Sequence, residues 1–438
     1  MAKEQGPLSG FRDQLPAQML PRQKALDTIK GVYESYGFTP LDTPHVERKE
    51  TLDGKYGEEG QKLMYQFEDH GGRELALRYD LTVPLARVVA QHGADIPMPF
   101  KRYQIGEVFR GESPQAGRYR EFTQFDADTV GTKSATADAE VVVMMADAME
   151  ALGADAKIRV NNRRILDALV DKSGTQDDAA GHIGVVDKVE KIGEKAALDE
   201  ISEKYGDRAA RVTQEYLSVS GSTEQRLSGL DNLLDGHDGA EEGIDNLQTV
   251  FKMVRKGTGR TSDEIDFDQT IARGLSYYTG IVYETMLKDL PQIGSVNSGG
   301  RYDNLVRDMG GPDLPAVGTS IGVDRLLTGL AELNPEEARK TPSEVMVINF
   351  GDDHAAEYLG IANKLRKSGI PTEIHYEPTR VKRQLRDANQ LGVPYVILAG
   401  PQELGEESAK IRDMKTGNET TVPLNELPQS LAQMKNEQ

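Results

Sequence analysis

The segment that most constrains the fold runs from Phe100 to Gly131, FKRYQIGEVFRGESPQAGRYREFTQFDADTVG. It predicts a strand that carries Arg110, a loop rich in glycine and proline, and a returning strand. Side chains alternate along a strand, so one face of the returning strand collects four polar or aromatic groups: Phe122, Gln124, Asp126 and Asp128. Such a face suits a nucleotide and a small cationic or amino-bearing substrate, because arginine pairs with phosphate and a phenyl ring stacks on a base. The alternative is a solvent-exposed hairpin whose charges only maintain solubility.

Periodicity predicts the elements around this segment. A helix is expected after Pro16, where apolar residues recur at helical spacing up to a stop at Gly37. Further extended segments indicate an antiparallel sheet: Phe38–Val46, Glu74–Leu77, Tyr103–Phe109 and Ile281–Met286. From 162 to 256 the chain becomes rich in Ala, Asp, Glu, Lys and Leu, with helical stretches expected at Ile183–Lys195 and Leu227–Leu234, which predicts a helical insertion over about 165–255. Ser320–Leu330 is predicted to be a closing helix that opens at a Gly-Thr-Ser turn.

The C-terminal part has a different pattern. A polar stretch with two prolines predicts a linker over 331–343. After it, predicted strands and helices alternate: Val345–Phe350, Ala355–Lys367, Thr372–Tyr376, Val381–Leu391 and Tyr395–Ala399. This alternation predicts a small domain with a largely parallel sheet over 344–438. The predicted fold class is therefore α/β, with an α+β domain over 1–330 whose mainly antiparallel sheet is flanked by helices, and a C-terminal α/β domain.

Three shorter motifs carry further candidate groups. In LRYDLTVPLA, Asp80 and Thr82 precede Pro84 and could bind an ammonium group together, although Asp and Thr before an apolar run are also common helix caps. In RGLSYYTGIVYE, which begins at Arg273, two adjacent tyrosines before a glycine fit a substrate loop or a hairpin with core tyrosines. In SGGRYD and PAVGTSIGVDRLL the glycines allow close approach to a ligand, and Arg325 suits a phosphate or a surface ion pair.

Composition excludes several classes of protein. The 438 residues contain no cysteine, which rules out disulfides, thiolate zinc sites and a cysteine nucleophile. No apolar run is long enough to cross a bilayer, so no membrane partner is expected. The first seven residues lack a basic stretch followed by an apolar one, so a cytoplasmic location is expected.

A formal net charge of −19 argues against a nucleic-acid partner only globally. Charge acts over roughly 10 Å at 0.1 M salt, so local basic clusters can still bind RNA. Two such sets occur, Lys101, Arg102, Arg118 and Arg120 in the central segment, and Arg380, Lys382, Arg383 and Arg386 in the last domain. The alternative for the second set is a solvated helix face.

Together these motifs resemble class II aminoacyl-tRNA synthetases. The segment around Arg110 is similar to their motif 2, the turn into a helix with Arg325 is similar to motif 3, and Pro44 in TPHVERKE is similar to the motif 1 proline of the dimer interface. RGLSYYTG resembles the signature loop of histidyl-tRNA synthetases. LRYDLT, GRYREFTQFDAD, SGGRYD and VKRQLRDANQLG are similar to segments of that family, in the same order, and the resemblance covers about 6–423.

The resemblance implies a role for each candidate residue. Histidine is expected to be bound by Asp80, Thr82, Gln124, Asp128, Arg273, Tyr277 and Tyr278. Within that set, Asp128 and Tyr278 would grip the imidazole nitrogens. ATP is expected to be bound by Arg110, Arg118, Phe122 and Arg325, and tRNA by Arg380, Lys382, Arg383 and Arg386. The catalytic residues would be Arg110 and Arg273, whose cations clamp the α-phosphorus attacked by the histidine carboxylate.

The implied reaction converts L-histidine and ATP to histidyl-adenylate and pyrophosphate, followed by transfer of histidine to tRNA(His). Mg²⁺ is expected with the ATP, but its protein ligands stay open. A homodimer is implied by the resemblance alone. Three alternatives are a synthetase paralogue that serves as regulatory subunit of ATP phosphoribosyltransferase, a synthetase-like module for a kinase, and a class II enzyme for another amino acid. The retained RGLSYYTG and last domain favour the histidine ligase.

Overall fold

The computed structural model describes residues 6–115, 117–272, 277–333 and 339–436. Contacts divide the chain into two compact units: Met1–Arg12 with Asp27–Asn334, and Asp13–Leu26 with Pro335–Gln438. None of the helices in these described stretches is long and apolar enough to cross a membrane.

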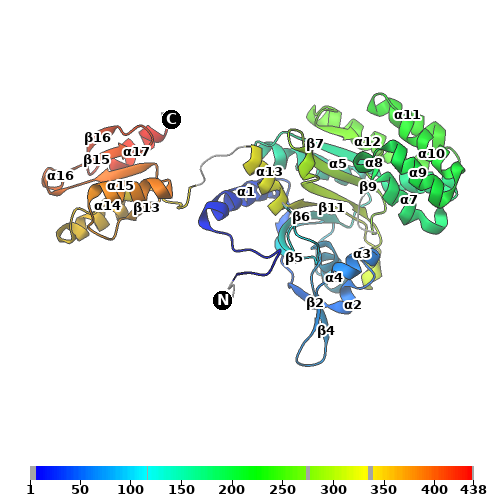
Figure 1. Ribbon diagram of the computed structural model, residues 1–438, viewed down its shortest axis with the longest axis horizontal. Coiled ribbons are helices and arrows are strands. Elements are labelled where there is room, and N and C mark those ends of the chain that lie inside the picture. The colour runs from blue at the N-terminus through cyan, green and yellow to red at the C-terminus, as the bar shows by residue number, and fades with distance from the viewer. Residues whose placement is uncertain (1–5, 116, 273–276, 334–338, 437–438) are drawn as a thin grey trace. The chain divides into compact units, whose positions relative to one another are not determined.

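The larger unit is built on an eight-stranded sheet (Figure 1). The strand order is β1 (Thr39–Pro40), β5 (Phe100–Phe109), β6 (Glu121–Val130), β11 (Ala316–Gly322), β10 (Asn297–Tyr302), β9 (Ile281–Leu287), β7 (Ala156–Asn162) and β8 (Ile265–Phe267). The two outermost pairings are parallel, and all inner pairings are antiparallel. The prediction of a mainly antiparallel sheet is confirmed.

Helices cover the sheet through apolar faces. On one face α5 (Ala135–Ala151) buries Val141, Val142 and Met145 in the same cluster as Val160 of β7. From α1 (Pro16–Ser35), Tyr33 is fully buried and packs edge-on to Phe125 in β6, with the ring centroids 5.0 Å apart. The helix ends as predicted, because Gly37 adopts a φ of 81°, which other residues rarely take. The last helix of the unit, α13 (Val323–Leu333), follows β11 directly.

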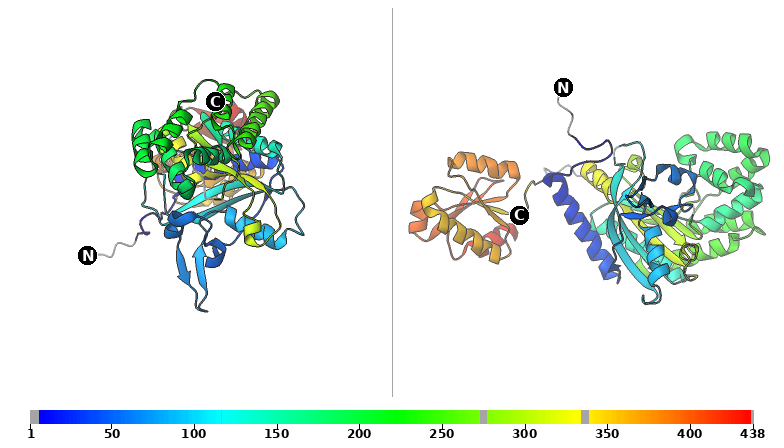
Figure 2. Two further views of the ribbon diagram at one scale, coloured as in Figure 1. Left: turned by 90° about the vertical axis from the view of Figure 1, so that its right-hand side faces the viewer. Right: turned by 90° about the horizontal axis from the view of Figure 1, so that it is seen from below.

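Seven helices form the insertion, which Figures 1 and 2 show grouped beside the strand β7 end of the sheet. They are α6 (Arg163–Ser173), α7 (Ala179–Val186), α8 (Val189–Ile192), α9 (Glu194–Tyr205), α10 (Asp207–Ser218), α11 (Thr223–Leu234) and α12 (Ala240–Thr258). Leu166, Leu227 and Leu247 from three of them share one core with the sheet. The insertion therefore packs on the eight-stranded sheet through one continuous apolar core and does not form a separate domain.

A three-stranded sheet lies beside the main one, in the order β2 (Val46–Arg48), β4 (Glu74–Leu77) and β3 (Gln66–Glu68). Short helices α2 (Lys49–Leu52) and α3 (Gly57–Leu63) and the longer α4 (Thr82–His92) complete this region. The α4 face is apolar at Val83, Leu85 and Val89, and it packs in one cluster with Val130 at the end of β6.

The smaller unit has a five-stranded sheet in the order β13 (Thr372–Ile374), β12 (Val345–Val347), β14 (Tyr395–Leu398), β15 (Ser408–Asp413) and β16 (Glu419–Pro423). Alternation along β12 sends Val345 and Val347 to the face covered by α14 (Ala355–Lys367) and α17 (Leu427–Asn436). Met346 points to the other face, which α15 (Val381–Leu391) covers through Ala388. A short helix, α16 (Pro401–Gly405), precedes β15.

Four predictions need correction. Residues 320–322 are not helical but form the end of β11. Ser320 and Ile321 pair with both β10 and β6, Gly322 pairs with β6, and the helix begins only at Val323. Only Thr39–Pro40 of Phe38–Val46 forms a strand before β2 begins. Ile183–Lys195 is interrupted between helices, with Gly193 at a φ of 85°. The last sheet is half antiparallel, since β15 and β16 form a hairpin that the strand-helix alternation did not reveal.

Candidate active site

A cavity of about 330 Å³ opens on the main sheet where β6, β11, β10 and β9 lie side by side. Its lining includes nine of the residues that the sequence singled out, Asp80, Thr82, Arg110, Arg118, Phe122, Gln124, Tyr277, Tyr278 and Arg325. These residues come from four separate stretches of chain. The fold therefore brings together the motifs that the sequence only suggested were related.

Asp80 is held from three directions at one end of the cavity. It is 1% exposed, and it accepts hydrogen bonds from the hydroxyls of Tyr56 (3.0 Å) and Tyr277 (3.1 Å) and from the amide of Val83 (3.0 Å). The Val83 contact caps α4, so the capping and ligand-binding interpretations of this aspartate are compatible. Burial raises the pKa of Asp80, while the Val83 amide and the Arg110 guanidinium oppose the rise.

Arg110 follows β5 directly, at the end of the strand and not inside it. Its Nε donates to the carbonyl of Tyr79 at 3.1 Å, and its guanidinium lies 4.3 Å from the Tyr79 ring centroid and 5.2 Å from that of Phe122. These contacts fix the side chain between two rings at the cavity wall. A planar guanidinium held in this way can meet a phosphate with two parallel hydrogen bonds.

Gln124 and Arg325 mark two further walls. Gln124 donates from Nε2 to the Ser320 hydroxyl at 2.7 Å, and its carbonyl oxygen has no hydrogen-bond partner among the described residues. Arg325 in the first turns of α13 donates to the Ser295 carbonyl at 2.8 Å. Arg118 is more exposed, with Glu112 at 3.9 Å.

Asp128 lies deeper than the sequence pattern implied. It is 2% exposed and is absent from the cavity lining, because Arg102 of the neighbouring strand pairs with it at 2.7 Å and the Tyr302 hydroxyl donates to it at 2.5 Å. Burial raises its pKa, opposed by Arg102 and Tyr302. Tyr302 in turn packs edge-on to Tyr277, with ring centroids 5.7 Å apart. Asp128 is thus engaged by Arg102 and Tyr302 and does not itself line the cavity.

Two glycines of the main sheet make room for Asp128 and Tyr278. A Cβ at Gly318 would overlap the Asp128 carboxylate, and a Cβ at Gly300 would lie 2.9 Å from the ring of Tyr278. Gly300 and Gly318 are cross-strand partners. The missing side chains therefore leave room for the carboxylate and the ring, and neither glycine itself lines the cavity.

Some predicted residues lie elsewhere. Arg273 is outside the described residues. Arg380, Lys382, Arg383 and Arg386 belong to the smaller unit, where all four are exposed at or in α15. Arg102 was grouped with surface cations, but it is 0% exposed because it lies on the inward side of β5 opposite Asp128. Lys101, on the other side of that strand, pairs with Glu140 at 2.6 Å.

The sequence interpretation missed Tyr56, Arg102 as a buried partner, Ser320 and Tyr302. Tyr56 lies 24 residues before Asp80, in the short connection between α2 and α3, and only the folded chain shows their contact. Tyr302 belongs to SGGRYD, where only the glycines had been assigned a role.

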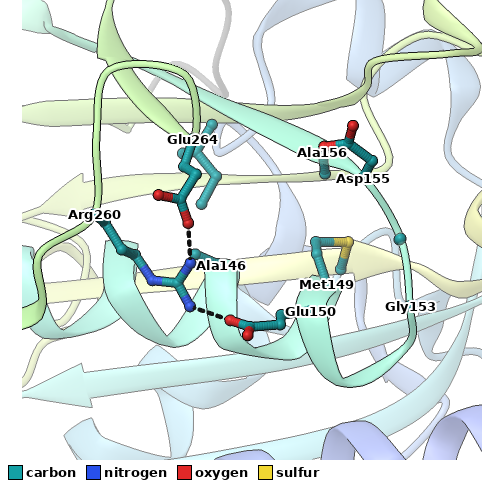
Figure 3. A pocket seen from close by; sticks show the side chains of 10 residues that line it. Ala146, Met149, Glu150, Gly153, Asp155, Ala156, Arg260 and Glu264 are labelled. Carbon is teal, nitrogen blue, oxygen red and sulfur yellow. Dashed lines mark hydrogen bonds and ion pairs between the residues drawn. The ribbon is translucent and has the colours of Figure 1, made fainter.

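A second hollow, of about 310 Å³, lies under α5 near the parallel edge of the sheet. Figure 3 shows Arg260 there between Glu150 and Glu264. Arg260 also pairs with Asp147 at 2.6 Å. Because three carboxylates already engage this guanidinium, the hollow presents no available cation to an anionic ligand.

An antiparallel sheet whose cavity is lined by an arginine, a phenyl ring and a buried acid, followed by a strand that leads into an arginine-bearing helix, is the arrangement of a class II aminoacyl-tRNA synthetase. Residues 10–326 match the family model for histidyl-tRNA synthetase, and residues 344–434 match that for an anticodon binding domain. The chain belongs to the histidyl-tRNA synthetase family.

Individual relatives agree with this assignment. The chain is 41% identical to the histidine–tRNA ligase of Rhodopirellula baltica over 412 residues, 93% of each chain, and 41% identical to that of Wolinella succinogenes over 418 residues, 94% of each. The crystal structure of histidyl-tRNA synthetase from Nostoc sp. PCC 7120 superposes with a TM-score of 0.89 at 33% identity, covering 99% of this chain and 100% of that one. A Bacillus halodurans structure described as ATP phosphoribosyltransferase regulatory subunit/histidyl-tRNA synthetase shares the fold, with a TM-score of 0.73 at 21% identity.

Proposed function

We propose that the protein joins L-histidine to tRNA(His) in two steps, forming histidyl-adenylate and pyrophosphate from histidine and ATP and then passing histidine to the 3′ end of the tRNA. The observation that carries this proposal is one cavity in which an ammonium-type site, centred on Asp80, adjoins a phosphate-type site, centred on Arg110. Both sites are needed for a reaction between an amino acid and a nucleotide.

The histidine half of the cavity supplies complementary groups. Asp80 would accept the ammonium group, with Thr82 and the unpaired carbonyl oxygen of Gln124 beside it. Tyr278 and Asp128 would bind the imidazole, the phenol from the cavity wall and the carboxylate from its position over Gly318. A site built to hydrogen-bond ring nitrogens disfavours isosteric apolar side chains, because its own polar groups would then lack partners.

The ATP half offers cations and a ring. Arg110 would hold the α-phosphate, Phe122 would stack on adenine, and Arg325 and Arg118 would approach the outer phosphates. Arg273 would complete the clamp opposite Arg110. Activation is an in-line attack by the carboxylate of histidine on the α-phosphorus, so positioning and charge stabilisation suffice and no side-chain nucleophile is required.

Mg²⁺ fits this cavity as a companion of the nucleotide. Glu112, Glu284 and Asp324 line the wall, and the described residues contain no group of three or more side chains that could hold a metal alone. Mg²⁺ commonly binds through substrate phosphates and one or two carboxylates. When bound, it would offset negative charge on the phosphates, with Glu112 and Glu284 as the candidate protein ligands.

The tRNA would be bound by the smaller unit. Arg380, Lys382, Arg383 and Arg386 are exposed and gather around the first turns of α15, where the helix dipole also favours phosphate. We assign residues 1–330 to catalysis, 331–343 to the linker and 344–438 to anticodon binding. A homodimer through the surface around Pro44, and a cytoplasmic location, complete the proposal.

Pyrophosphate exchange tests the activity. Purified protein should exchange labelled pyrophosphate into ATP with histidine and with none of the other nineteen amino acids. Exchange with several amino acids would indicate another class II specificity. No exchange with any would indicate a paralogue without catalytic activity, as in the regulatory-subunit alternative.

A further inference from the structure

Three buried charged side chains lie on β5 and β6, next to the histidine half of the cavity. Arg102 of β5 and Asp126 and Asp128 of β6 are 0%, 1% and 2% exposed. Asp126 and Asp128 share one face of the strand, and Arg102 is the cross-strand partner of Asp128. These three side chains carry a net charge of −1 when both acids are ionised, and a second buried guanidinium, that of Arg78, also acts on Asp126.

Asp126 is the member of this cluster with the fewest partners. Neither of its carboxyl oxygens has a well-formed hydrogen bond to a described residue, although Ser320, opposite on β11, is close enough to lower the carboxyl pKa. Arg102 uses Nη2 for Asp128 and for the Leu81 carbonyl (3.2 Å), while its Nε and Nη1 have no such partner in the described chain. A cluster that served only to hold the sheet together would satisfy these groups.

The surroundings of Asp126 disfavour a second buried negative charge. The charged and titratable groups that influence Asp126 or its neighbour Asp128 include two arginines, a third acid and four phenols: Arg78, Arg102, Asp80, Tyr33, Tyr278, Tyr283 and Tyr302. Burial first, and then the charge of Asp128, raise the pKa of Asp126 to about 7, while Arg102 acts against the rise. An imidazole has an ordinary pKa of about 6.5, so ring and carboxyl compete for a proton in the same pH range.

We propose that Asp126 and Arg102 set the charge that Asp128 presents to the ring of histidine, so that the histidine complex keeps one proton that the free protein and free histidine lose above neutral pH. Asp126 is a positioning residue in this scheme, because it acts through Asp128 and does not reach the cavity. The proton resides on the ring or on Asp126. On the ring it places a positive charge beside the two acids, and on Asp126 it neutralises one of them, so either arrangement lowers the net negative charge of the buried site. The inference rests on the proposed histidine site.

The consequence is a pH-dependent affinity for histidine and not for ATP. Above about pH 7 binding must take up a proton, so affinity falls as pH rises, by at most tenfold per pH unit. Between about pH 7 and about pH 8.5 we expect the KM for histidine to rise roughly five- to tenfold in the wild type. The KM for ATP should stay level, since the phosphate half lies at the other end of the cavity.

Asp126→Asn tests the role of the carboxyl with little change of shape. Its histidine KM in pyrophosphate exchange should be flat over the same pH range and lower than that of the wild type at the alkaline end. Asp266→Asn is the matched control, because Asp266 is a partly buried acid paired with Arg226 at 2.8 Å on the far strand of the sheet. This control should keep the wild-type pH profile.

Titration calorimetry of the wild type with histidine, at about pH 8 in two buffers of different ionisation heat, gives a test that needs no variant. Uptake of close to one proton supports the proposal. No uptake, or a wild-type pH profile in Asp126→Asn, overturns it, and so does an equal loss of histidine and ATP binding, which would indicate a role in folding alone. Failure of the wild type to activate histidine would overturn the proposed function itself.

Discussion

Tyr277 donates a hydrogen bond to Asp80 at 3.1 Å, across 197 residues of sequence. The contact joins the segment before β9 to the residue that caps α4. Tyr56 donates to the other oxygen of the same carboxylate at 3.0 Å. Asp80 is therefore oriented before any ligand binds, which lowers the ordering cost of gripping an ammonium group.

Removing the Tyr277 hydroxyl should weaken histidine binding selectively. We expect Tyr277→Phe to raise the KM for histidine roughly three- to tenfold, the usual effect of one buried hydrogen bond, with little change for ATP. Steady-state pyrophosphate exchange measures both constants. Tyr216→Phe is the control: its hydroxyl donates to the Gln269 carbonyl at 2.9 Å, so this variant should lose stability but keep the histidine KM.

Replacing the guanidinium of Arg110 by an ammonium group should slow the reaction at the α-phosphate of ATP. Lysine keeps the charge but cannot make two parallel hydrogen bonds or stack between Tyr79 and Phe122, so Arg110→Lys should lower kcat for exchange by about a hundredfold or more. Arg163→Lys, at an exposed pair with Asp167, should leave kcat unchanged. A normal kcat in Arg110→Lys would remove this arginine from the phosphate-binding role.

A methyl group at Gly318 should displace Asp128. Because a Cβ at Gly318 would overlap the carboxylate of Asp128, Gly318→Ala should move that acid and raise the histidine KM by more than tenfold. In Gly322→Ala the nearest atom to the new Cβ is 3.8 Å away, so its histidine KM should stay near the wild-type value. Equal effects of the two substitutions would contradict the proposed role of Gly318.

His182 should make the insertion sensitive to acid. The imidazole is 0% exposed between the hydroxyls of Thr175 (2.7 Å) and Thr213 (2.9 Å), and burial lowers its pKa to about 4. The unfolded chain, with a histidine pKa near 6.5, binds the proton more readily, so stability falls as pH drops from about 6.5 to about 4. Thermal unfolding should show a smaller loss over that range in His182→Gln, even if this variant is less stable at pH 7.

The exposed cations of α15 should contribute to tRNA affinity. Arg383→Glu should weaken binding of tRNA(His) roughly tenfold or more and reduce its dependence on salt, while exchange without tRNA stays normal. Lys367→Glu, on the exposed surface of α14, provides the same charge change elsewhere in the unit. Equal losses in both variants would mean that only the net charge of this unit matters.

Strong local patterns predicted much of the fold. The helices α14 and α15 have the expected bounds, because their apolar positions recur at helical spacing between glycine stops. The hairpin of β15 and β16 was missed because SAKIRD and ETTVP contain few apolar residues, and their pairing stabilises them as strands. Residues 318–320 are central strand because they have partners on both sides, which a Gly-Thr-Ser sequence does not reveal.

The sequence predicted which residues form the candidate site but not which of them line the cavity and which are buried beside it. Alternation along β6 places Gln124 and Asp128 on one face of the strand. Of these two side chains only Gln124 lines the cavity, because Asp128 is paired with Arg102 and Tyr302. The burial of Arg102 depends on a cross-strand neighbour, and the role of Tyr56 depends on a distant carboxylate. Neither relationship has a signature in local sequence.

The adjoining glycines on β10 and β11 limit how this protein could acquire a different substrate. At Gly300 and Gly318 even the smallest side chain would collide with Tyr278 or Asp128, so these two positions cannot accept a larger residue while both neighbours keep their places. A change of amino-acid preference would have to arise in the surrounding phenols and acids, with both glycines retained.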